Sequence, residues 1–377
     1  MIIQSKRVFL NGRFLPAQIE IKQEKIVNVY PYNHQAVDHD YDNKIISPGF
    51  IDIHTHGAYG CDVNTGTVED YQIWLANLVK EGVTSVYPST STTKKEVLYQ
   101  ALANVKKAAD KNYPGARILG IHLEGPFLEE VHRGAQPAQY LLEPSVDEFE
   151  KFYQASQGFI KYVTMATEQD KDFELLKHLD SLGIVVSIGH SAATYQEASL
   201  AFANGARGIT HTFNGMSSLH HREPGIVGSA LTLDVFAELI ADGQHVYPAA
   251  AQALFKSNQK VMMITDSSAL KGMKPGIYEI EPGIKIEVDE HGSNRFYGTN
   301  TLLGSSLKFN EGLKILVEEA LVDISSALIA MSLNPALYLK IADHKGRIMV
   351  GYDADLTVID EQYQIVATYV LGEKQVI

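Results

Sequence analysis

Cysteine is almost absent from this 377-residue chain, and long apolar runs are missing. The single cysteine, Cys61, excludes an internal disulfide framework and is typical of proteins from a reducing compartment. No stretch approaches the roughly 18 uninterrupted apolar residues of a transmembrane helix, and the first residues lack the apolar core of a signal peptide. We therefore expect a cytoplasmic protein with no membrane partner.

Positive charge is also scarce. Lys and Arg number 32 against 45 Asp and Glu, which gives a net charge of −13 with histidine neutral. Such a balance disfavours nucleic acids and anionic membranes as partners. An anionic substrate would have to be held by a few local positive groups. Apolar residues make up 45% of the chain, enough for the large core of a globular protein.

A glycine-rich GxGxxG turn is missing after the first strand of the central region, which disfavours an open doubly wound sheet. Apolar segments alternate there with helical patterns, as in the parallel βα units of an α/β (β/α)8 TIM-like barrel. The expected strands are 50–54, 83–87, 117–124, 160–166, 184–190, 208–212, 236–241 and 261–266. The expected helices are 67–81, 94–110, 146–157, 173–182, 195–204 and 248–256, with further helices over 307–341.

The two chain ends share a different pattern, in which short strands alternate with turn residues. We predict that 1–48 and 345–377 form one small β-sandwich domain and that 49–344 form the barrel. The alternation breaks at 267–306, a segment rich in Gly and Pro that follows the last barrel strand directly. Two interpretations stay open for it: a surface insertion, or a lid over the site.

The chemistry of an α/β barrel sits at the carboxyl ends of its strands, and here those ends carry residues that bind metals. The sequence Ser47–Gly57, SPGFIDIHTHG, places two histidines at i and i+2, on one face of a strand. The full set at expected strand ends is His54, His56, Glu124, His190, His211 and Asp266. Each alone could be a second-layer histidine, a cap or a turn residue. Together they predict a metal centre.

Imidazole and carboxylate ligands without thiolate suit zinc, iron, manganese or cobalt with an open position for water. Such a metal lowers the pKa of bound water to about 7. Asp266 would take the proton from that water as it attacks a carbonyl carbon, and would then deliver it to a leaving amine.

Several motifs together resemble the amidohydrolase superfamily, over essentially the whole chain. They are SPGFIDIHTHG, HLEGPF, SIGHSAAT, HTFNGM, EPGIVG, ADGQHV and TDS. Within the superfamily they are most similar to the amino-sugar-phosphate deacetylases. This resemblance implies hydrolysis of the N-acetyl group of N-acetyl-D-glucosamine 6-phosphate, giving D-glucosamine 6-phosphate and acetate. It also implies a divalent metal cofactor, with one or two ions per subunit.

The resemblance assigns roles to the strand-end residues. Glu124, His190 and His211 would bind the principal metal, with Glu124 in the bridging position that a modified lysine occupies in many relatives. His54 and His56 would build a neighbouring second site, and Asp266 would be the acid/base residue beside the metals.

The resemblance also assigns the substrate contacts. The backbone at Asn214 and Gly215 would meet the sugar phosphate, and Arg222 would grip the phosphate bidentately. His245 would reach the phosphate of a neighbouring subunit, which implies a homodimer. From the residues alone, Arg222 is an ordinary solvated loop residue.

Some positions depart from the family pattern or stay open. Gln136 stands where part of the family has a histidine that touches the substrate carbonyl, so carbonyl polarisation would depend more on the metal. His132 is either a further substrate contact or an exposed loop histidine, and Cys61 either a ligand or a buried inert thiol. Two rival functions also stay open: another amidohydrolase reaction, such as cyclic-amide hydrolysis or deamination, and a non-catalytic barrel that binds an amino-sugar phosphate.

Overall fold

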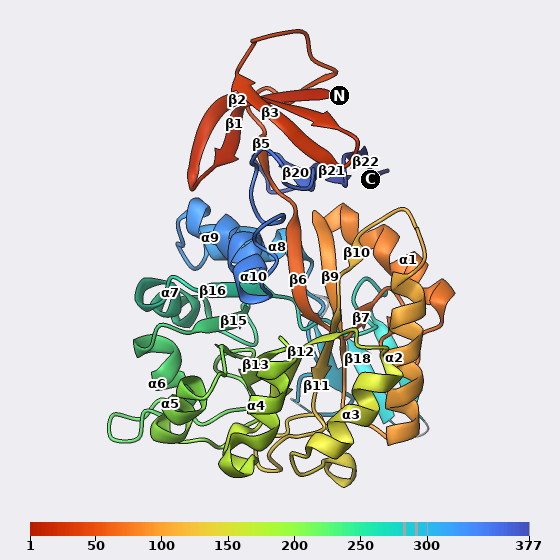
Figure 1. Ribbon diagram of the computed structural model, residues 1–377, viewed down its shortest axis with the longest axis vertical. Coiled ribbons are helices and arrows are strands. Elements are labelled where there is room, and N and C mark those ends of the chain that lie inside the picture. Colours follow the sequence, from red (N-terminus) through yellow and green to blue (C-terminus); the bar gives the residue numbers. More distant parts are fainter. Residues whose placement is uncertain (282–283, 291–292, 300, 377) are drawn as a thin grey trace.

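A computed structural model describes residues 1–281, 284–290, 293–299 and 301–376 and shows a parallel barrel beneath a smaller, mostly antiparallel sheet (Figure 1). Two backbone hydrogen bonds join the first and last barrel strands, Asp266 N to His54 O and His56 N to Ser267 O, both 2.8 Å. The barrel strands are β6 (Phe50–Thr55), β9 (Val83–Thr90), β11 (Ile121–Glu124), β12 (Ile160–Met165), β13 (Val185–Ile188), β14 (Gly208–Ile209), β15 (Phe236–Ile240) and β16 (Val261–Ile264). The expected fold class is confirmed.

Helices cover the outside of the barrel and bury their apolar faces against it (Figure 1). The helix expected at 67–81 begins with a capping box between Thr67 and Asp70, as its sequence indicates. The helices are α1 (Val68–Leu78), α2 (Lys95–Ala109), α3 (Val146–Ala155), α4 (Glu174–Ser181), α5 (Tyr195–Ala203), α6 (Gly225–Thr232), α7 (Pro248–Ser257), α8 (Phe309–Glu318), α9 (Ile324–Met331) and α10 (Leu333–Tyr338). The sequence reasoning missed α6 because its two glycines and small residues weaken the helical pattern.

Strands from both ends of the chain pair in the smaller sheet, whose order is β22-β21-β20-β5-β1-β2-β3, with β4 beside β1. The strands are β1 (Ile2–Leu10), β2 (Arg13–Lys22), β3 (Lys25–Pro31), β4 (His39–Asp40), β5 (Ile45–Pro48), β20 (Leu356–Ile359), β21 (Ile365–Val370) and β22 (Glu373–Lys374). A core of its own includes Ile19, Ile46 and Val358. The domain division at residues 48 and 345 stays a prediction.

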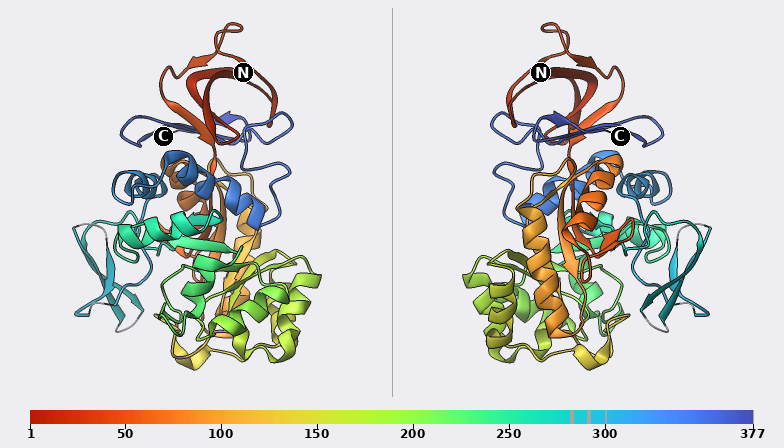
Figure 2. Two further views of the ribbon diagram at one scale, coloured as in Figure 1. Left: turned by 90° about the vertical axis from the view of Figure 1, so that its left-hand side faces the viewer. Right: turned by 90° about the vertical axis from the view of Figure 1, so that its right-hand side faces the viewer.

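The segment between β16 and α8 contains a three-stranded antiparallel sheet that projects from the side of the barrel (Figure 2). Its strands are β17 (Gly276–Glu281), β18 (Ile284–Val288) and β19 (Asn294–Phe296). A buried ion pair ties the start of this segment to the turn between α1 and β9: Lys271 Nζ lies 2.9 Å from Glu81 Oε2. Closure of the segment as a lid stays a prediction. Within the described residues, no helix has the length and apolar character needed to cross a membrane.

Candidate metal centre

The six strand-end residues predicted from the sequence converge at the carboxyl end of the barrel. Three of them, His190, His211 and Asp266, lie just beyond the ends of β13, β14 and β16 and adopt positive φ angles of 48°, 29° and 47°. Non-glycine residues persist in this region only where the surrounding structure holds them, and such positions cluster at functional sites.

Two triads share this space: His54 with His56 and Asp266, and Glu124 with His190 and His211. Glu124 joins them, because its Oε1 lies 3.3 Å from His190 Nε2, 3.2 Å from His211 Nε2 and 3.3 Å from His54 Nε2. Its Oε2 lies 3.2 Å from His56 Nε2. The carboxylate therefore faces both groups at once.

Asp266 closes the second triad. Its Oδ1 lies 3.2 Å from His56 Nε2 and 3.5 Å from His54 Nε2. The Nε2 atoms within each pair of histidines are similarly close, at 3.3 Å for His54 with His56 and 3.1 Å for His190 with His211.

Hydrogen bonds on the far side of each ring determine which nitrogen faces the centre. The Nδ1 of His190 donates to the carbonyl oxygen of His132 at 2.9 Å, and that of His211 to the carbonyl of Asn214 at 3.0 Å. His56 Nδ1 lies 3.0 Å from the carbonyl oxygen of Ser89. Because a carbonyl can only accept, Nδ1 carries a proton, and Nε2 is the nitrogen that faces inward and is available to a metal.

His54 has the same orientation with a different acceptor, since its Nδ1 lies 3.0 Å from Glu238 Oε2. The Nε2 atoms of four imidazoles and the oxygens of two carboxylates thus face one another. A tetrahedral metal with bonds of about 2.0–2.1 Å separates its ligand atoms by about 3.3 Å, which matches these spacings. The residues present therefore fit a divalent ion in each triad.

The electrostatics of the centre favour positive charge. Burial lowers the pKa of His56, but Asp266 and Glu124 outweigh burial and raise it to about 9. For Asp266, burial raises the pKa, yet the nearby His54 and His56 bring it down to about 2. Burial likewise opposes ionisation of Glu124, and His54 and His190 hold its pKa well below the usual range. A metal ion would supply this positive charge in place of protons.

Glu238 is a functional candidate that the sequence reasoning missed. It lies on β15, is fully buried, and accepts hydrogen bonds from His54 Nδ1, from His211 N at 3.0 Å and from Tyr162 OH at 2.7 Å. An acid in the middle of the apolar strand Phe236–Ile240 was the one available signal.

Three of the residues predicted to bind the substrate, Gln136, His132 and Gly215, lie around the first triad. The Gln136 amide donates to Glu124 Oε2 at 2.7 Å, and its Oε1 accepts from Thr92 N at 2.6 Å. His132 contributes a backbone carbonyl to His190. Gly215, at φ +58°, passes so close that a Cβ would lie 2.9 Å from His190 Nδ1. Backbone atoms, which a residue pattern cannot reveal, thus help to shape the site.

Three further predicted residues lie apart from the triads. Arg222 is exposed between β14 and α6, with its Nη1 2.8 Å from His221 Nε2. The His245 imidazole is 9% exposed and lies 2.6 Å from Asp242 Oδ2 of the same chain. Burial raises the pKa of the Cys61 thiol, and Cys61 is in neither triad, as expected of an inert thiol.

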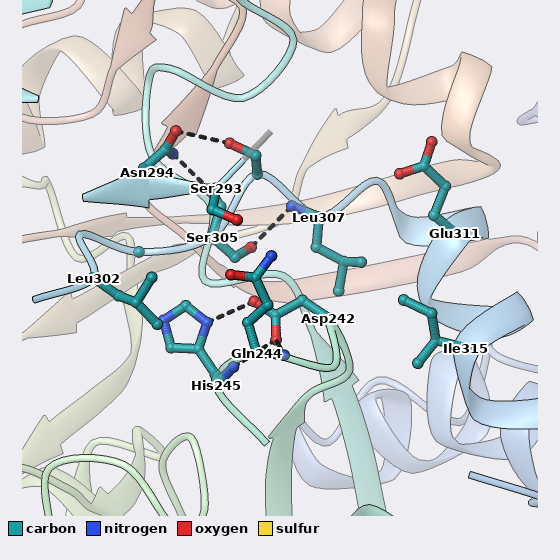
Figure 3. Close-up of a pocket in the computed structure, with 12 residues that line it drawn as sticks. Asp242, Gln244, His245, Ser293, Asn294, Leu302, Ser305, Leu307, Glu311 and Ile315 are labelled. Atoms are coloured by element: carbon teal, nitrogen blue, oxygen red, sulfur yellow. Dashed lines mark hydrogen bonds and ion pairs between the residues drawn. The ribbon is translucent and has the colours of Figure 1, made fainter. Parts of the chain in front are cut away.

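Figure 3 shows that Asp242 and His245 line a pocket together with residues that follow β16 and residues of α8. One wall, which includes Ser293, Leu302 and Ser305, belongs to the segment between β16 and α8. Ser305 N donates to Asp266 O at 2.7 Å. The pocket therefore adjoins the second triad.

Known proteins resemble this chain over nearly its full length. The amidohydrolase family model matches residues 45–376. N-acetylglucosamine-6-phosphate deacetylase of Bacillus subtilis is 40% identical over 88% of this chain and 84% of its own, and N-acetylgalactosamine-6-phosphate deacetylase of Escherichia coli O157:H7 is 31% identical over 99% and 98%. An aspartate-to-alanine variant of the Mycobacterium smegmatis N-acetyl-D-glucosamine-6-phosphate deacetylase, solved with N-acetyl-D-glucosamine-6-phosphate, superposes with a TM-score of 0.92 at 29% identity, covering 100% of this chain and 99% of that one.

Proposed function

The chain belongs to the amidohydrolase family and to its amino-sugar-phosphate deacetylases, and on that premise we propose how its residues perform the reaction. The protein is a metal-dependent hydrolase that converts N-acetyl-D-glucosamine 6-phosphate and water to D-glucosamine 6-phosphate and acetate. The observation that carries the proposed site is the pair of triads, in which imidazole nitrogens and carboxylate oxygens face one another.

We propose that Glu124, His190 and His211 hold the principal ion and that His54, His56 and Asp266 hold a second ion. Zinc or iron suits this donor set best, and manganese or cobalt is chemically compatible. A divalent ion bound there lowers the pKa of a water molecule and polarises the amide carbonyl. Glu124 faces both positions, so its carboxylate would contribute to holding either ion.

Asp266 acts as the general base and then as the general acid. Its carboxylate takes a proton from the water that attacks the acetyl carbon, and passes that proton to the departing nitrogen when the C–N bond breaks. Gln136 stabilises the developing oxyanion with its second amide hydrogen, while the first is held by Glu124.

We propose that the substrate phosphate is bound by Arg222 and by the backbone at Asn214 and Gly215. A guanidinium is suited to this position because it binds phosphate bidentately and overcomes locally the net charge of −13. His132 and His245 are proposed as further substrate contacts. The single, buried cysteine supports a cytoplasmic location.

A homodimer, in which His245 serves the neighbouring site, is the proposed assembly. The His245 side chain points to Asp242 within its own subunit, so the proposal requires a direct test. Mixing inactive His245→Ala and Asp266→Asn subunits should restore activity if His245 acts across the interface, because one heterodimer site then has both residues intact. No recovery, despite subunit exchange shown by mass spectrometry, would assign His245 to its own site.

A second candidate substrate is N-acetyl-D-galactosamine 6-phosphate. The relative from Escherichia coli O157:H7 that is 31% identical over 98% of its own length is named for this sugar. Both candidates present the same acetamide and phosphate to the triads and to Arg222.

The test is acetate release from both sugar phosphates, with unphosphorylated N-acetylglucosamine as the matched control, before and after chelation. Turnover that needs the phosphate, is lost on chelation and returns with a divalent ion is the expected result. Equal turnover of phosphorylated and unphosphorylated sugar would refute the phosphate contacts. No turnover by metal-loaded protein would refute the deacetylase and favour a binding barrel, or another amidohydrolase reaction if dihydroorotate or a nucleoside is consumed.

A further inference from the structure

Glu238 differs from the other acceptors behind the metal-site histidines. His56, His190 and His211 present Nδ1 to backbone carbonyl oxygens, whereas His54 presents Nδ1 to the Glu238 carboxylate at 3.0 Å. A charged acceptor forms the stronger hydrogen bond and makes the opposite ring nitrogen a better metal donor. Of these four rings, His54 alone therefore has its lone pair strengthened by a full negative charge.

The same carboxylate oxygen also reaches the other triad. Glu238 Oε2 accepts from the backbone N–H of His211 at 3.0 Å, in addition to His54 Nδ1. One buried atom thus holds the side chain of a residue in the second triad and the main chain of a residue in the first. Glu238 therefore affects the two triads unequally, because it contacts the metal-binding ring of His54 but only the backbone of His211.

The position of Glu238 is itself held from below. Tyr162 OH donates to Oε1 at 2.7 Å, and the Tyr162 ring stacks on His122 with centroids 3.9 Å apart and an interplanar angle of 12°. His122 in turn meets the His54 ring edge-on, with centroids 4.4 Å apart. Glu238, Tyr162 and His122 form a packed floor beneath His54, so the carboxylate cannot move away without disturbing this layer.

We propose that Glu238 is a positioning residue whose charge and reach keep His54 in its metal-binding form and thereby set the occupancy of the His54–His56–Asp266 site. The inference rests on the metal-dependent function proposed above and adds an unequal dependence of the two ions on one side chain. Loss of the charge weakens the ion at His54 strongly and the ion at Glu124, His190 and His211 only slightly.

The test is Glu238→Gln, a substitution of equal size. The glutamine oxygen can still accept from His54 and His211, and its amide can donate to the Tyr162 hydroxyl, so the principal loss is the charge. Metal content after dialysis and affinity against a chromogenic chelator are measured with Zn²⁺ and Co²⁺, without substrate. We expect one of two ions to bind about 10- to 100-fold more weakly, with the other within threefold of wild type.

Tyr162→Phe is the matched control, because it removes the hydrogen bond to Glu238 Oε1 and leaves the contacts of Oε2 to His54 and His211 in place. We expect both ions to bind within threefold of wild type. If Tyr162→Phe weakens the ion as much as Glu238→Gln does, the effect comes from packing of the floor and the proposal is overturned.

If Glu238→Gln does not fold, Glu238→Asp replaces it. That variant keeps the charge but draws it back from His54, and it should lose the same ion. Wild-type affinity in whichever variant folds overturns the proposal, as does a wild-type protein that binds a single ion. The metal-binding test uses no substrate, so it is independent of the acetate assay. A protein that binds two ions but releases no acetate in that assay would refute the deacetylase function and leave the role of Glu238 unaffected.

Discussion

Replacing Asp266 with asparagine separates its proposed proton transfer from its place in the structure. The backbone of residue 266 is held independently of the side chain, through Asp266 N to His54 O at 2.8 Å and Ser305 N to Asp266 O at 2.7 Å. Asparagine has the same size, so we expect the loop to keep its conformation. The variant retains an oxygen that can face His54 and His56 but no longer accepts a proton from water.

The expected loss in kcat follows from that single function. General acid–base catalysis contributes about 10²- to 10⁴-fold to rate, which corresponds to about 2.7–5.4 kcal/mol of activation free energy. KM should change much less, because the proposed phosphate contacts lie elsewhere. Acetate release is measured at saturating substrate, on protein whose metal content has been determined in the same preparation.

Metal loss must be kept apart from loss of the base, since Asp266 Oδ1 lies 3.2 Å from His56 Nε2. Assays at increasing Zn²⁺ restore the metal content and should leave kcat low. A variant with wild-type metal content and a kcat within threefold of wild type would refute the assignment of Asp266 as the base.

Three further outcomes follow from the structure. Lys271→Met leaves the Glu81 carboxylate buried without its cation, which should lower the free energy of unfolding by about 3–5 kcal/mol. For a chain of this length, the melting temperature should fall by about 4–6 °C. Adding Glu81→Gln should recover much of the lost stability. Chelated protein should lose stability in thermal melts as pH rises from about 6.5 to about 9, because folding raises the pKa of His56 to about 9. The stability that protonated His56 contributes is lost across that interval. Metal-loaded protein should not show this loss. Arg222→Ala should raise KM for the phosphorylated sugar about 10- to 150-fold at nearly unchanged kcat, and Arg222→Lys should do so less; an unchanged KM would remove Arg222 from the phosphate site.

The fold class and the meeting of the six strand-end residues could be predicted because local pattern determines both. Alternation of strand and helix specifies parallel units, and a barrel brings the carboxyl ends of its strands to one face. The positions of His54, Glu124 and Asp266 could be predicted from their place at the end of an apolar segment alone. Their roles in binding and catalysis rest on the resemblance and the proposed chemistry.

Other parts of the site depend on contacts that no local pattern carries. His132 looked like a side-chain candidate, but its backbone carbonyl is the group that orients His190. Glu238 meets His54 across 184 positions of sequence, and nothing in strand β15 specifies that partner. Helix α6 was not predicted, because small residues and glycines give only a weak amphipathic pattern, although Gly225–Ala230 are buried.

The smaller sheet places a constraint on the order of events during synthesis. Strand β20 lies between β5 and β21, so β5 receives this neighbour only after roughly 300 further residues have been made. At translation rates of about 5–20 residues per second, that delay is about 15–60 s. During it the β5 edge, with Ile45 and Ile46 that are later buried, stays open to pairing with other chains. If translation stalls while the barrel residues are being made, the nascent chain keeps an unpaired β5 edge that can pair with other chains. Synthesis of β20 and β21 is therefore the step that ends this risk of aggregation.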